Sequence, residues 1–585
     1  MKTQIEQLVT AAVTQMPGIK EAGDGAVPTP EIERTRDRQH GDYACNIAMR
    51  LAKPLRQKPR DIAQLIIDRL PASDLIESVE IAGPGFINFR LSAAASHAEL
   101  ISILERGDLY GHGTQGAGQK ILVEYVSANP TGPLHVGHGR HVAYGATVAN
   151  LLKATGHDVH EEYYVNDAGR QMDILTLSVW VRMLAAADLD VTFPSNGYRG
   201  QYVIDIAADA ARQLADTVSA EYLSAIDSLP ADAPDGDADA YLDAFIELAR
   251  KSLGEERFIA IHDCALNTIL GDIKDDMAEF GAHPDQWFSE QSMMDSGAVE
   301  RALDKVKASG KTYEQDGAIW FRDTDYGDEK DRVVVRDNGR TTYFASDIAY
   351  HLHKRERGFD TLLDILGADH HGYIARVRAG IEAMGEPPDI LEVELVQFVA
   401  LFRGQEKQQM STRSGEFITL RELREEVGND AARFFFVTRS NEQHLDFDLE
   451  LAKSQSNDNP VYYIQYAHAR VWSVMRELQE RSLEWNADNA KQNLHLLDAD
   501  HEQALMQRLM RYPEILELSA RQRAPQHLVH YLRELAHELH TYYNAHRFIV
   551  DDDNLRDARL LLINAVRQVI RNGLAIVGVS APQSM

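Results

Sequence analysis

The stretch SANPTGPLHVGHGRHVAYGATVANLL, residues 127–152, decides the fold class of this 585-residue chain. It starts as a loop rich in proline and glycine, continues as a helical pattern, and directly follows the apolar run ILVEYV. The next run, DVHEEYYVND, has the composition of a second strand. The order strand, helix, strand is typical of a doubly wound parallel sheet, so we expect a Rossmann-like α/β domain around this stretch.

Two histidines, His135 and His138, stand where the helical pattern begins. A helix N-terminus presents unpaired backbone N–H groups and the positive end of the helix dipole, which together bind anions. Residues at i and i+3 share one side of a helix, and glycines such as Gly137 let a phosphate approach the backbone. The pattern therefore predicts a phosphate site, whereas the H-x-x-H spacing alone also fits two histidines that merely cap a helix.

The rest of the chain divides into units on either side of this domain. The expected units are a small α+β domain over residues 1–92, a glycine-rich linker over 93–119, the α/β domain over 120–457 with a helical insertion at about 196–284, and an α-helical bundle over 458–585. In the first unit we expect a hairpin that turns at Gly83-Pro84-Gly85. In the α/β domain we expect strands at AIWFR, RVVVRD and TYFASD, and the sheet is completed by FDTLLDILGADH and LEVELVQFVALF.

Composition limits the class of protein. The net charge of −30 is uneven: Arg34 to Arg60 holds eight Lys or Arg against two acids, whereas Gln213 to Ala249 holds nine acids and no Lys or Arg. Such a basic region can favour one polyanion at one place, although two oppositely charged solvated faces are an equally good interpretation. Two cysteines exclude a disulfide framework and a cysteine-rich zinc site. The absence of a long apolar run predicts a cytoplasmic protein without a membrane span.

The sequence HVGH after ANPTGPL resembles the HIGH signature of class I aminoacyl-tRNA synthetases and their nucleotidylyltransferase relatives. The resemblance implies a second motif, a KMSKS-type loop that clamps ATP, and residues 409–413, QMSTR, stand where it is expected. Met410 and Ser411 agree with that motif, and either Arg413 or Lys407 would supply its positive charge. The resemblance implies ATP with Mg²⁺, bound by these residues, by the histidine pair and by the first-motif loop of Ala128, Asn129, Pro130, Thr131, Gly132, Pro133, Leu134 and Val136.

Two acidic residues predict the substrate. Glu124 ends the strand before the loop, and Asp347 follows Tyr343 by four positions. Two carboxylates that face one cavity are costly to bury unless a cation neutralises them. A guanidinium offers a planar fork of donors that two carboxylates can grip, whereas a lysine ammonium cannot fill both. We therefore expect a guanidinium substrate, with Ser127 and Asn129 lining the turn beside it.

Motifs in order over essentially the full length resemble the bacterial members of the arginyl-tRNA synthetase family. They are VEYVSANPTGPLHVGHGR, YYVNDAG, TYFASDIAYH, GADHHGY, MSTRSGEFITL, NDAARFFF, SNEQHLDFDL, NPVYYIQYAHAR and GVSAP. The resemblance implies that arginine is attached to tRNA(Arg) through an arginyl-adenylate. The positions of the family's arginine site are matched by Glu124 and Asp347 for the guanidinium, Tyr343 as the residue that closes the pocket, Ser127 and Asn129 for the amino-acid backbone, and His370 on the pocket wall.

The resemblance also assigns the flanking units. The N-terminal unit would grip the tRNA elbow, which gives the basic run a phosphate-contacting role through Arg34, Arg36, Arg50 and Lys53. The helical bundle would bind the anticodon, with Tyr463 and Met585 at positions that touch anticodon-loop bases in the family. The last residues, APQSM, differ from the APERM-like end expected there. A monomer that binds L-arginine, ATP and tRNA(Arg), and no zinc, is implied.

Two alternatives compete with this interpretation. Another class I enzyme is opposed by the acid pair Glu124 and Asp347, which does not suit an apolar amino acid, and a small nucleotidylyltransferase would not need the long helical tail. A catalytically silent synthetase paralogue that binds tRNA is favoured by the altered second motif. It is opposed by the intact His135, Gly137 and His138.

Overall fold

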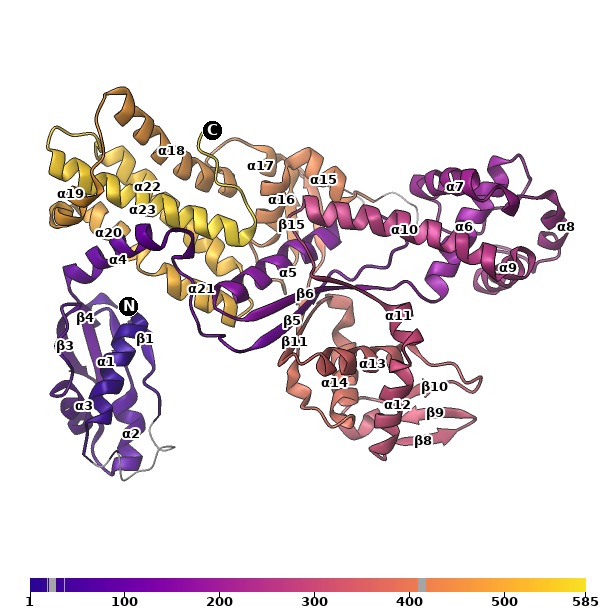
Figure 1. Cartoon of the computed structure of the whole chain (residues 1–585), viewed down its shortest axis with the longest axis horizontal. Helices are drawn as coiled ribbons and strands as arrows, with labels where there is room; N and C mark the ends of the chain where they lie inside the picture. Colours follow the sequence, from indigo (N-terminus) through magenta and orange to yellow (C-terminus); the bar gives the residue numbers. More distant parts are fainter. Residues whose placement is uncertain (18, 20–27, 36, 409–416) are drawn as a thin grey trace.

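A computed structural model of the chain describes residues 1–17, 19, 28–35, 37–408 and 417–585 (Figure 1). A parallel sheet lies at the centre, a helical bundle and the N-terminal unit lie to one side of it, and two smaller lobes lie to the other (Figure 1). The predicted fold class, a Rossmann-like α/β domain between a small α+β unit and a helical bundle, is confirmed.

The N-terminal unit packs helices against an antiparallel sheet with strand order β1-β2-β4-β3. Its expected hairpin is confirmed, because β3 and β4 pair antiparallel across the turn. Gly85 in that turn has φ +143°, and a Cβ there would lie 2.8 Å from the Cβ of Pro59, so glycine fits where the turn meets the first residue of the preceding helix. The elements are α1 (Lys2–Thr14), β1 (Ile32–Arg34), β2 (Tyr43–Cys45), α2 (Ile47–Leu55), α3 (Pro59–Ile67), β3 (Ile76–Ala82) and β4 (Phe86–Leu91).

The stretch expected to be a linker contains helix α4 (Ala93–Arg106). The Ser92 hydroxyl caps this helix by accepting from the backbone N–H of Ala95. The helix contacts the C-terminal bundle, where Lys491 Nζ lies 2.9 Å from Glu105 Oε1. The connection between the N-terminal unit and the catalytic domain is therefore ordered in its first half.

The central sheet has five parallel strands in the order β12-β11-β5-β6-β7. Its order changes direction between β5 and β11, and in such sheets ligands bind outside the carboxyl ends of the strands at this point. Helix α5 follows β5, as expected from the opening stretch. The sheet and its helices are β5 (Lys120–Tyr125), α5 (Val136–Ala154), β6 (Asp158–Val165), α6 (Arg170–Ala186), β7 (Gln286–Ser289), β11 (Thr361–Gly367) and β12 (Leu391–Val396).

Two lobes interrupt this sheet. The predicted helical insertion holds α7 (Gln201–Gln213), α8 (Leu223–Ile226), α9 (Ala238–Leu253) and α10 (Glu255–Glu279). The second lobe follows β7 and carries an antiparallel sheet of order β10-β9-β8. Its elements are α11 (Glu290–Asp295), α12 (Ala298–Ala308), β8 (Thr312–Gln315), β9 (Ala318–Phe321), β10 (Arg332–Val335), α13 (Tyr343–Glu356) and, after β11, α14 (Ile374–Ala383).

Two strand predictions in the catalytic domain are wrong. TYFASD is not a strand but the start of α13, whose apolar residues Phe344, Ile348 and Leu352 recur at helical spacing and pack into one buried cluster. LEVELVQFVALF is not one strand of the central sheet. Its first half forms β12, whereas its second half forms β13 (Val399–Arg403), which pairs with β14 (Glu406–Lys407) and β15 (Leu445–Asp448) in a separate sheet.

The C-terminal part is helical, as predicted. Among the described residues one helix, α23, is long and apolar enough to cross a membrane, but 78% of its most apolar window is buried inside the protein. That burial identifies α23 as the core helix of the bundle. The helices of this part are α18 (Pro460–Glu480), α19 (Ala487–Gln492), α20 (Asp500–Leu509), α21 (Tyr512–Arg521), α22 (Gln526–Ala545) and α23 (Asp553–Val577). Three shorter helices precede them, namely α15 (Leu420–Val427), α16 (Asn429–Phe436) and α17 (Leu449–Lys453).

Candidate active site

The two histidines of the first motif cap helix α5 through each other. The backbone N–H of His138 donates to Nδ1 of His135, the backbone N–H of His135 donates to Nδ1 of His138, both at 3.3 Å, and the rings stack with centroids 3.6 Å apart. Burial lowers the pKa of both imidazoles, so both are neutral at neutral pH. Because each Nδ1 accepts a hydrogen bond, each ring carries its proton on Nε2, which leaves an N–H donor for a ligand.

The chain after the second motif pairs directly with the first motif. The backbone N–H of Val136 donates to the carbonyl of Ile418 at 3.3 Å, and that of Leu420 donates to the carbonyl of Leu134 at 2.8 Å. His135 and Thr419 thus form an antiparallel bridge. Residues 418–420 therefore lie beside the N-terminus of α5.

Three predicted residues of the second motif, Met410, Ser411 and Arg413, lie outside the described residues. Lys407 lies just before them on β14, where it is exposed and pairs with Phe402 of β13. Lys407 and Arg413 both remain candidates for the positive charge of this motif.

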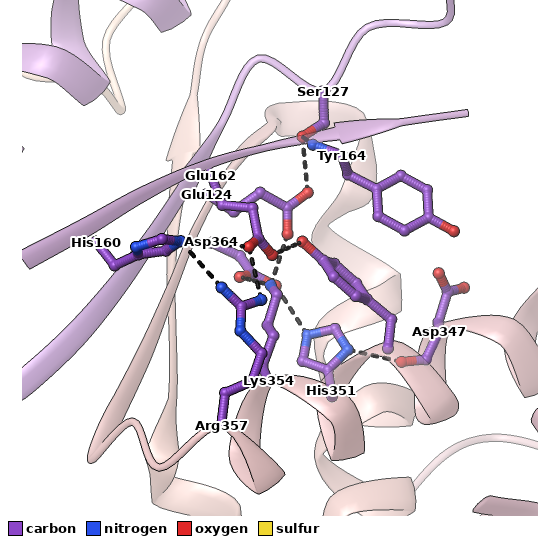
Figure 2. Close-up of polar contacts among 11 residues, drawn as sticks. Glu124, Ser127, His160, Glu162, Tyr164, Asp347, His351, Lys354, Arg357 and Asp364 are labelled. Atoms are coloured by element: carbon purple, nitrogen blue, oxygen red, sulfur yellow. Dashed lines mark hydrogen bonds and ion pairs between the residues drawn. The ribbon is translucent and has the colours of Figure 1, made fainter. Parts of the chain in front are cut away.

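Glu124 has a cationic partner within the protein, which the sequence analysis did not foresee. Its Oε2 accepts from Lys354 Nζ at 2.6 Å, and its Oε1 accepts from the hydroxyl of Ser127 at 2.8 Å (Figure 2). Lys354 is fully buried and also donates to Asp364 Oδ1 at 2.7 Å. Burial of Glu124 by itself therefore does not require a substrate cation, because Lys354 offsets its charge within the protein.

Burial leaves the charge of Asp347 unfavourable. Its carboxylate lies near Glu290, Glu124 and Asp364, and burial together with these like charges raises its pKa to about 7, whereas His351 lowers it. Burial likewise raises the pKa of Glu290 to about 7. An acidic pair with raised pKa values favours a cation in its neighbourhood, which is the environment expected of a guanidinium site.

The loop after β5 is strained where it meets Glu124. Val126 and Ser127 have φ values of 72° and 41°, in the left-handed region that non-glycine residues rarely adopt. Ser127 is held there because its hydroxyl accepts from the backbone N–H of Tyr164 at 3.1 Å while it donates to Glu124. Of the other loop residues, Ala128, Pro130, Leu134 and Val136 are buried, Thr131, Gly132, Pro133 and Gly137 are partly buried, and Asn129 is exposed.

Two predicted pocket residues lie at the surface. Tyr343 is the first residue of α13 and is 66% exposed, and its hydroxyl lies close to Gly169. His370 is also exposed, with Nε2 3.8 Å from Asp369 Oδ2. Both therefore lie outside the buried contacts that surround Glu124.

The predicted tRNA-binding residues differ in how far they are engaged. Arg34 is bound within the protein, because its guanidinium donates to both carboxylate oxygens of Glu514 on α21, at 3.0 and 2.9 Å. Arg50 pairs with Glu31 at 2.8 Å, and Lys53 is exposed. Arg36 lies outside the described residues. In the bundle, the Tyr463 hydroxyl lies 3.2 Å from His537 Nδ1, and Met585 is half exposed.

The residues that the sequence analysis missed come mainly from one face of α13. His351 and Lys354 follow Asp347 at i+4 and i+7, which is the spacing of one helical face, so a helix prediction for this segment would have grouped them. Asp364 on β11 lies directly opposite Glu124 in the sheet, and Tyr164 and Glu290 come from β6 and α11. No local signal links these last residues to Glu124.

Three family models match the chain. They are described as Arginyl tRNA synthetase N terminal domain, over residues 3–91, tRNA synthetases class I (R), catalytic domain, over 99–190 and 288–454, and DALR anticodon binding domain, over 464–585.

Whole-chain relatives agree with these matches. Arginine–tRNA ligases of Thioalkalivibrio sulfidiphilus and of Legionella pneumophila strain Paris are 56% and 52% identical to the chain, with full coverage of both partners in each case. The solved structure of Thermus thermophilus arginyl-tRNA synthetase shares the fold, with a TM-score of 0.72 at 24% identity and full coverage of both chains.

Proposed function

The chain belongs to the arginyl-tRNA synthetase family, and from that premise we propose how its residues divide the work of an arginine–tRNA ligase. The enzyme uses ATP to attach arginine to tRNA. No similarity supports the alternative of a catalytically silent paralogue.

We assign the phosphate chemistry to His135 and His138. The arginine carboxylate is ionised at neutral pH and attacks the α-phosphorus of ATP without a general base, so the site must supply alignment and donors for the growing charge. The two Nε2–H groups at the N-terminus of α5 are such donors, and the reciprocal backbone contacts fix both rings before the substrate arrives. The ribose hydroxyl of the tRNA end then attacks the mixed anhydride and releases AMP.

We assign the recognition of arginine to Glu124 and Asp347. Ser127 and Asn129, on the loop that leads from Glu124 to the histidines, would contact the rest of the amino acid. The observation that carries this assignment is the position of the acidic groups at the carboxyl edge of the sheet, one loop away from His135. Tyr343 and His370 lie at the surface of this edge, and we propose that they contact arginine only when the site is filled. The guanidinium would restore charge balance at Asp347 and Glu290.

We propose that Mg²⁺ enters as a complex with ATP and is held by phosphate oxygens. Within the described parts of the chain, no three His, Cys, Asp or Glu side chains are grouped so that they could hold a metal ion. We therefore assign no protein ligand to Mg²⁺. Positive charge for the departing pyrophosphate would come from Lys407 or Arg413.

We propose that tRNA spans the N-terminal unit, residues 1–92, and the bundle, residues 458–585, with the linker at 93–119 and the catalytic domain at 120–457 between them. The exposed Lys53, with Arg36 and Arg50, would contact the elbow, and Tyr463 and Met585 would contact the anticodon loop. Arg34 contributes only if tRNA displaces Glu514. We further propose that the protein is cytoplasmic and acts as a monomer. Light scattering of the free and tRNA-bound protein tests whether it is a monomer.

Charging of total tRNA tests this assignment. The purified protein, ATP and Mg²⁺ are incubated with each amino acid in turn, and arginine alone is expected to be incorporated. The double variant His135→Ala/His138→Ala is expected to lose charging and to keep tRNA binding. Unchanged charging by this variant would show that the histidines do not act on the phosphates.

A further inference from the structure

Three carboxylates lie side by side across the central sheet. Glu124 on β5 is directly opposite Glu162 on β6 and directly opposite Asp364 on β11. Residues in such register point to the same face of a sheet, and neighbouring strands lie only about 4.8 Å apart. All three residues are buried. This carboxylate row, Glu162, Glu124 and Asp364, is unstable in the folded protein unless cations neutralise it.

Helix α13 covers this face, and the cations come from this helix and from Arg357, which follows its last residue. Lys354 Nζ donates to Glu124 Oε2 at 2.6 Å and to Asp364 Oδ1 at 2.7 Å, and Arg357 Nη1 donates to Glu162 Oε2 at 2.6 Å (Figure 2). Lys354 thus bridges two strands at the point where the sheet order changes direction. Its ammonium also lies 4.2 Å from the ring centroid of Tyr350, which completes a fully enclosed environment.

Lys354 leaves the second oxygen of each partner to another group. Asp364 Oδ2 lies 2.8 Å from His351 Nε2, and Glu124 Oε1 accepts from the Ser127 hydroxyl at 2.8 Å. A carboxylate held by one oxygen can still rotate, but Glu124 is held by both. Its Oε1 edge is therefore fixed on the side of the loop that leads to the histidine pair.

We propose that Lys354 is a positioning residue for arginine recognition: its ammonium binds Glu124 Oε2 and thereby holds the Oε1 edge of that carboxylate toward the arginine pocket. The inference rests on the proposed contact between Glu124 and the guanidinium. Lys354 itself touches no substrate, since its ammonium lies behind Glu124 and is fully buried. Without Lys354, Glu124 and Asp364 are adjacent buried carboxylates without a cation, and such a pair holds a proton to higher pH.

The groups that face the carboxylate row come from five elements. On β5, β6 and β11 these are the three carboxylates and His160, whose Nε2 lies 3.7 Å from Glu162 Oε2. On α13 they are Tyr350, His351 and Lys354, and Arg357 follows at the end of that helix. Asp347 on α13 and Glu290 on α11 add negative charge on the pocket side. Among the described contacts, Lys354 is the one buried cation next to Glu124. No other cation there would therefore offset the loss of Lys354.

The test is the pH dependence of kcat/KM for arginine in Lys354→Met. We expect the midpoint of the rise in kcat/KM to move to higher pH by at least one unit, KM for arginine at pH 7 to rise at least tenfold, and KM for ATP to stay unchanged. The double variant Lys354→Met/Asp364→Asn removes one carboxylate and is expected to move the midpoint back toward that of the unmodified enzyme. If Lys354 only stabilised the fold, both variants would be less stable, but the midpoint of their kcat/KM profiles would be that of the unmodified enzyme.

Arg357→Met is the matched control, since it strips a cation from an equally buried carboxylate of the same row but one strand farther from Asp364. It is expected to lower the melting temperature and to leave the arginine profile unchanged. A Lys354→Met profile with the original midpoint would overturn the inference.

Two further variants keep the outcome decisive. Glu124→Gln separates the two ideas: if it leaves kcat/KM for arginine unchanged, the proposed contact of Glu124 with arginine fails, whereas if only Lys354→Met is without effect, the positioning role fails. Should Lys354→Met not fold, Asp364→Asn leaves Lys354 entirely to Glu124, and the midpoint is expected to move to lower pH. An unmoved midpoint in Asp364→Asn would then contradict the positioning role.

Discussion

Replacement of Asp347 by Asn is expected to stabilise helix α13 and to disable the enzyme. Burial and the like charges of Glu290, Glu124 and Asp364 raise the pKa of Asp347 from 3.8 to about 7. A raised carboxyl pKa means that the folded state holds the proton that the unfolded state has lost, so stability falls as the pH rises from about 4 to about 7. At 1.36 kcal/mol per pKa unit, the ionised carboxylate costs about 4 kcal/mol above pH 7.

Asn removes that cost because it cannot ionise. We therefore expect α13 to be more stable in Asp347→Asn than in the unmodified enzyme by up to about 4 kcal/mol at pH 8, with a smaller difference near pH 5. Because a chain of several units does not unfold in one step, the measurement is local: hydrogen exchange of peptides that cover residues 343–356, without substrates. Asp304→Asn on the adjacent α12, where the carboxylate is 79% exposed, is the control and should show no such difference.

The same variant is expected to lose arginine recognition. Removal of one partner of a buried ion pair costs about 3–5 kcal/mol, which corresponds to a loss of about 10² to 5 × 10³ in kcat/KM for arginine, measured by charging of tRNA. Unchanged kcat/KM would refute the guanidinium contact. Equal exchange of α13 at pH 8 in both proteins would refute the electrostatic argument.

Two other predictions test parts of the molecule outside this pocket. His138→Asn is expected to lower kcat by about 10² to 10³, since one donor to developing charge is worth about 3–4 kcal/mol, while KM for tRNA stays unchanged; a parallel loss of tRNA affinity would point to a structural defect. Glu514→Gln weakens the bidentate contact with Arg34, which is worth about 1.5–3 kcal/mol. We therefore expect a protease to cleave faster within residues 93–119, and we expect KM for tRNA to change while KM for arginine does not. Identical cleavage rates would show that this contact does not hold the N-terminal unit in place.

The parts of the fold that sequence predicts well are those with long local patterns. Strand β5, helix α5 and the hairpin of β3 and β4 each have a periodicity or a turn signal of their own. The strand prediction for TYFASD failed because a run of six residues fits a strand and a helix equally, and packing of the later residues of α13 decides between them. The partners of Lys354 could not be predicted, because one is 10 positions away and the other 230, and only the strand order brings them together.

The helical state of residues 343–356 matters for function as well as for the fold. A strand would alternate its side chains between two faces, so Asp347, His351 and Lys354 could not all reach the carboxylate row. The helix places Lys354, with Arg357 at its end, over the row, and it places Asp347 about two turns nearer the N-terminus of α13 than Lys354, beside the pocket. Helix α13 thus carries both Lys354, which neutralises acids of the carboxylate row, and Asp347, whose own charge is left unfavourable. Because these tasks share one rigid helix, a shift of α13 would change the charge of the pocket and the orientation of Glu124 together.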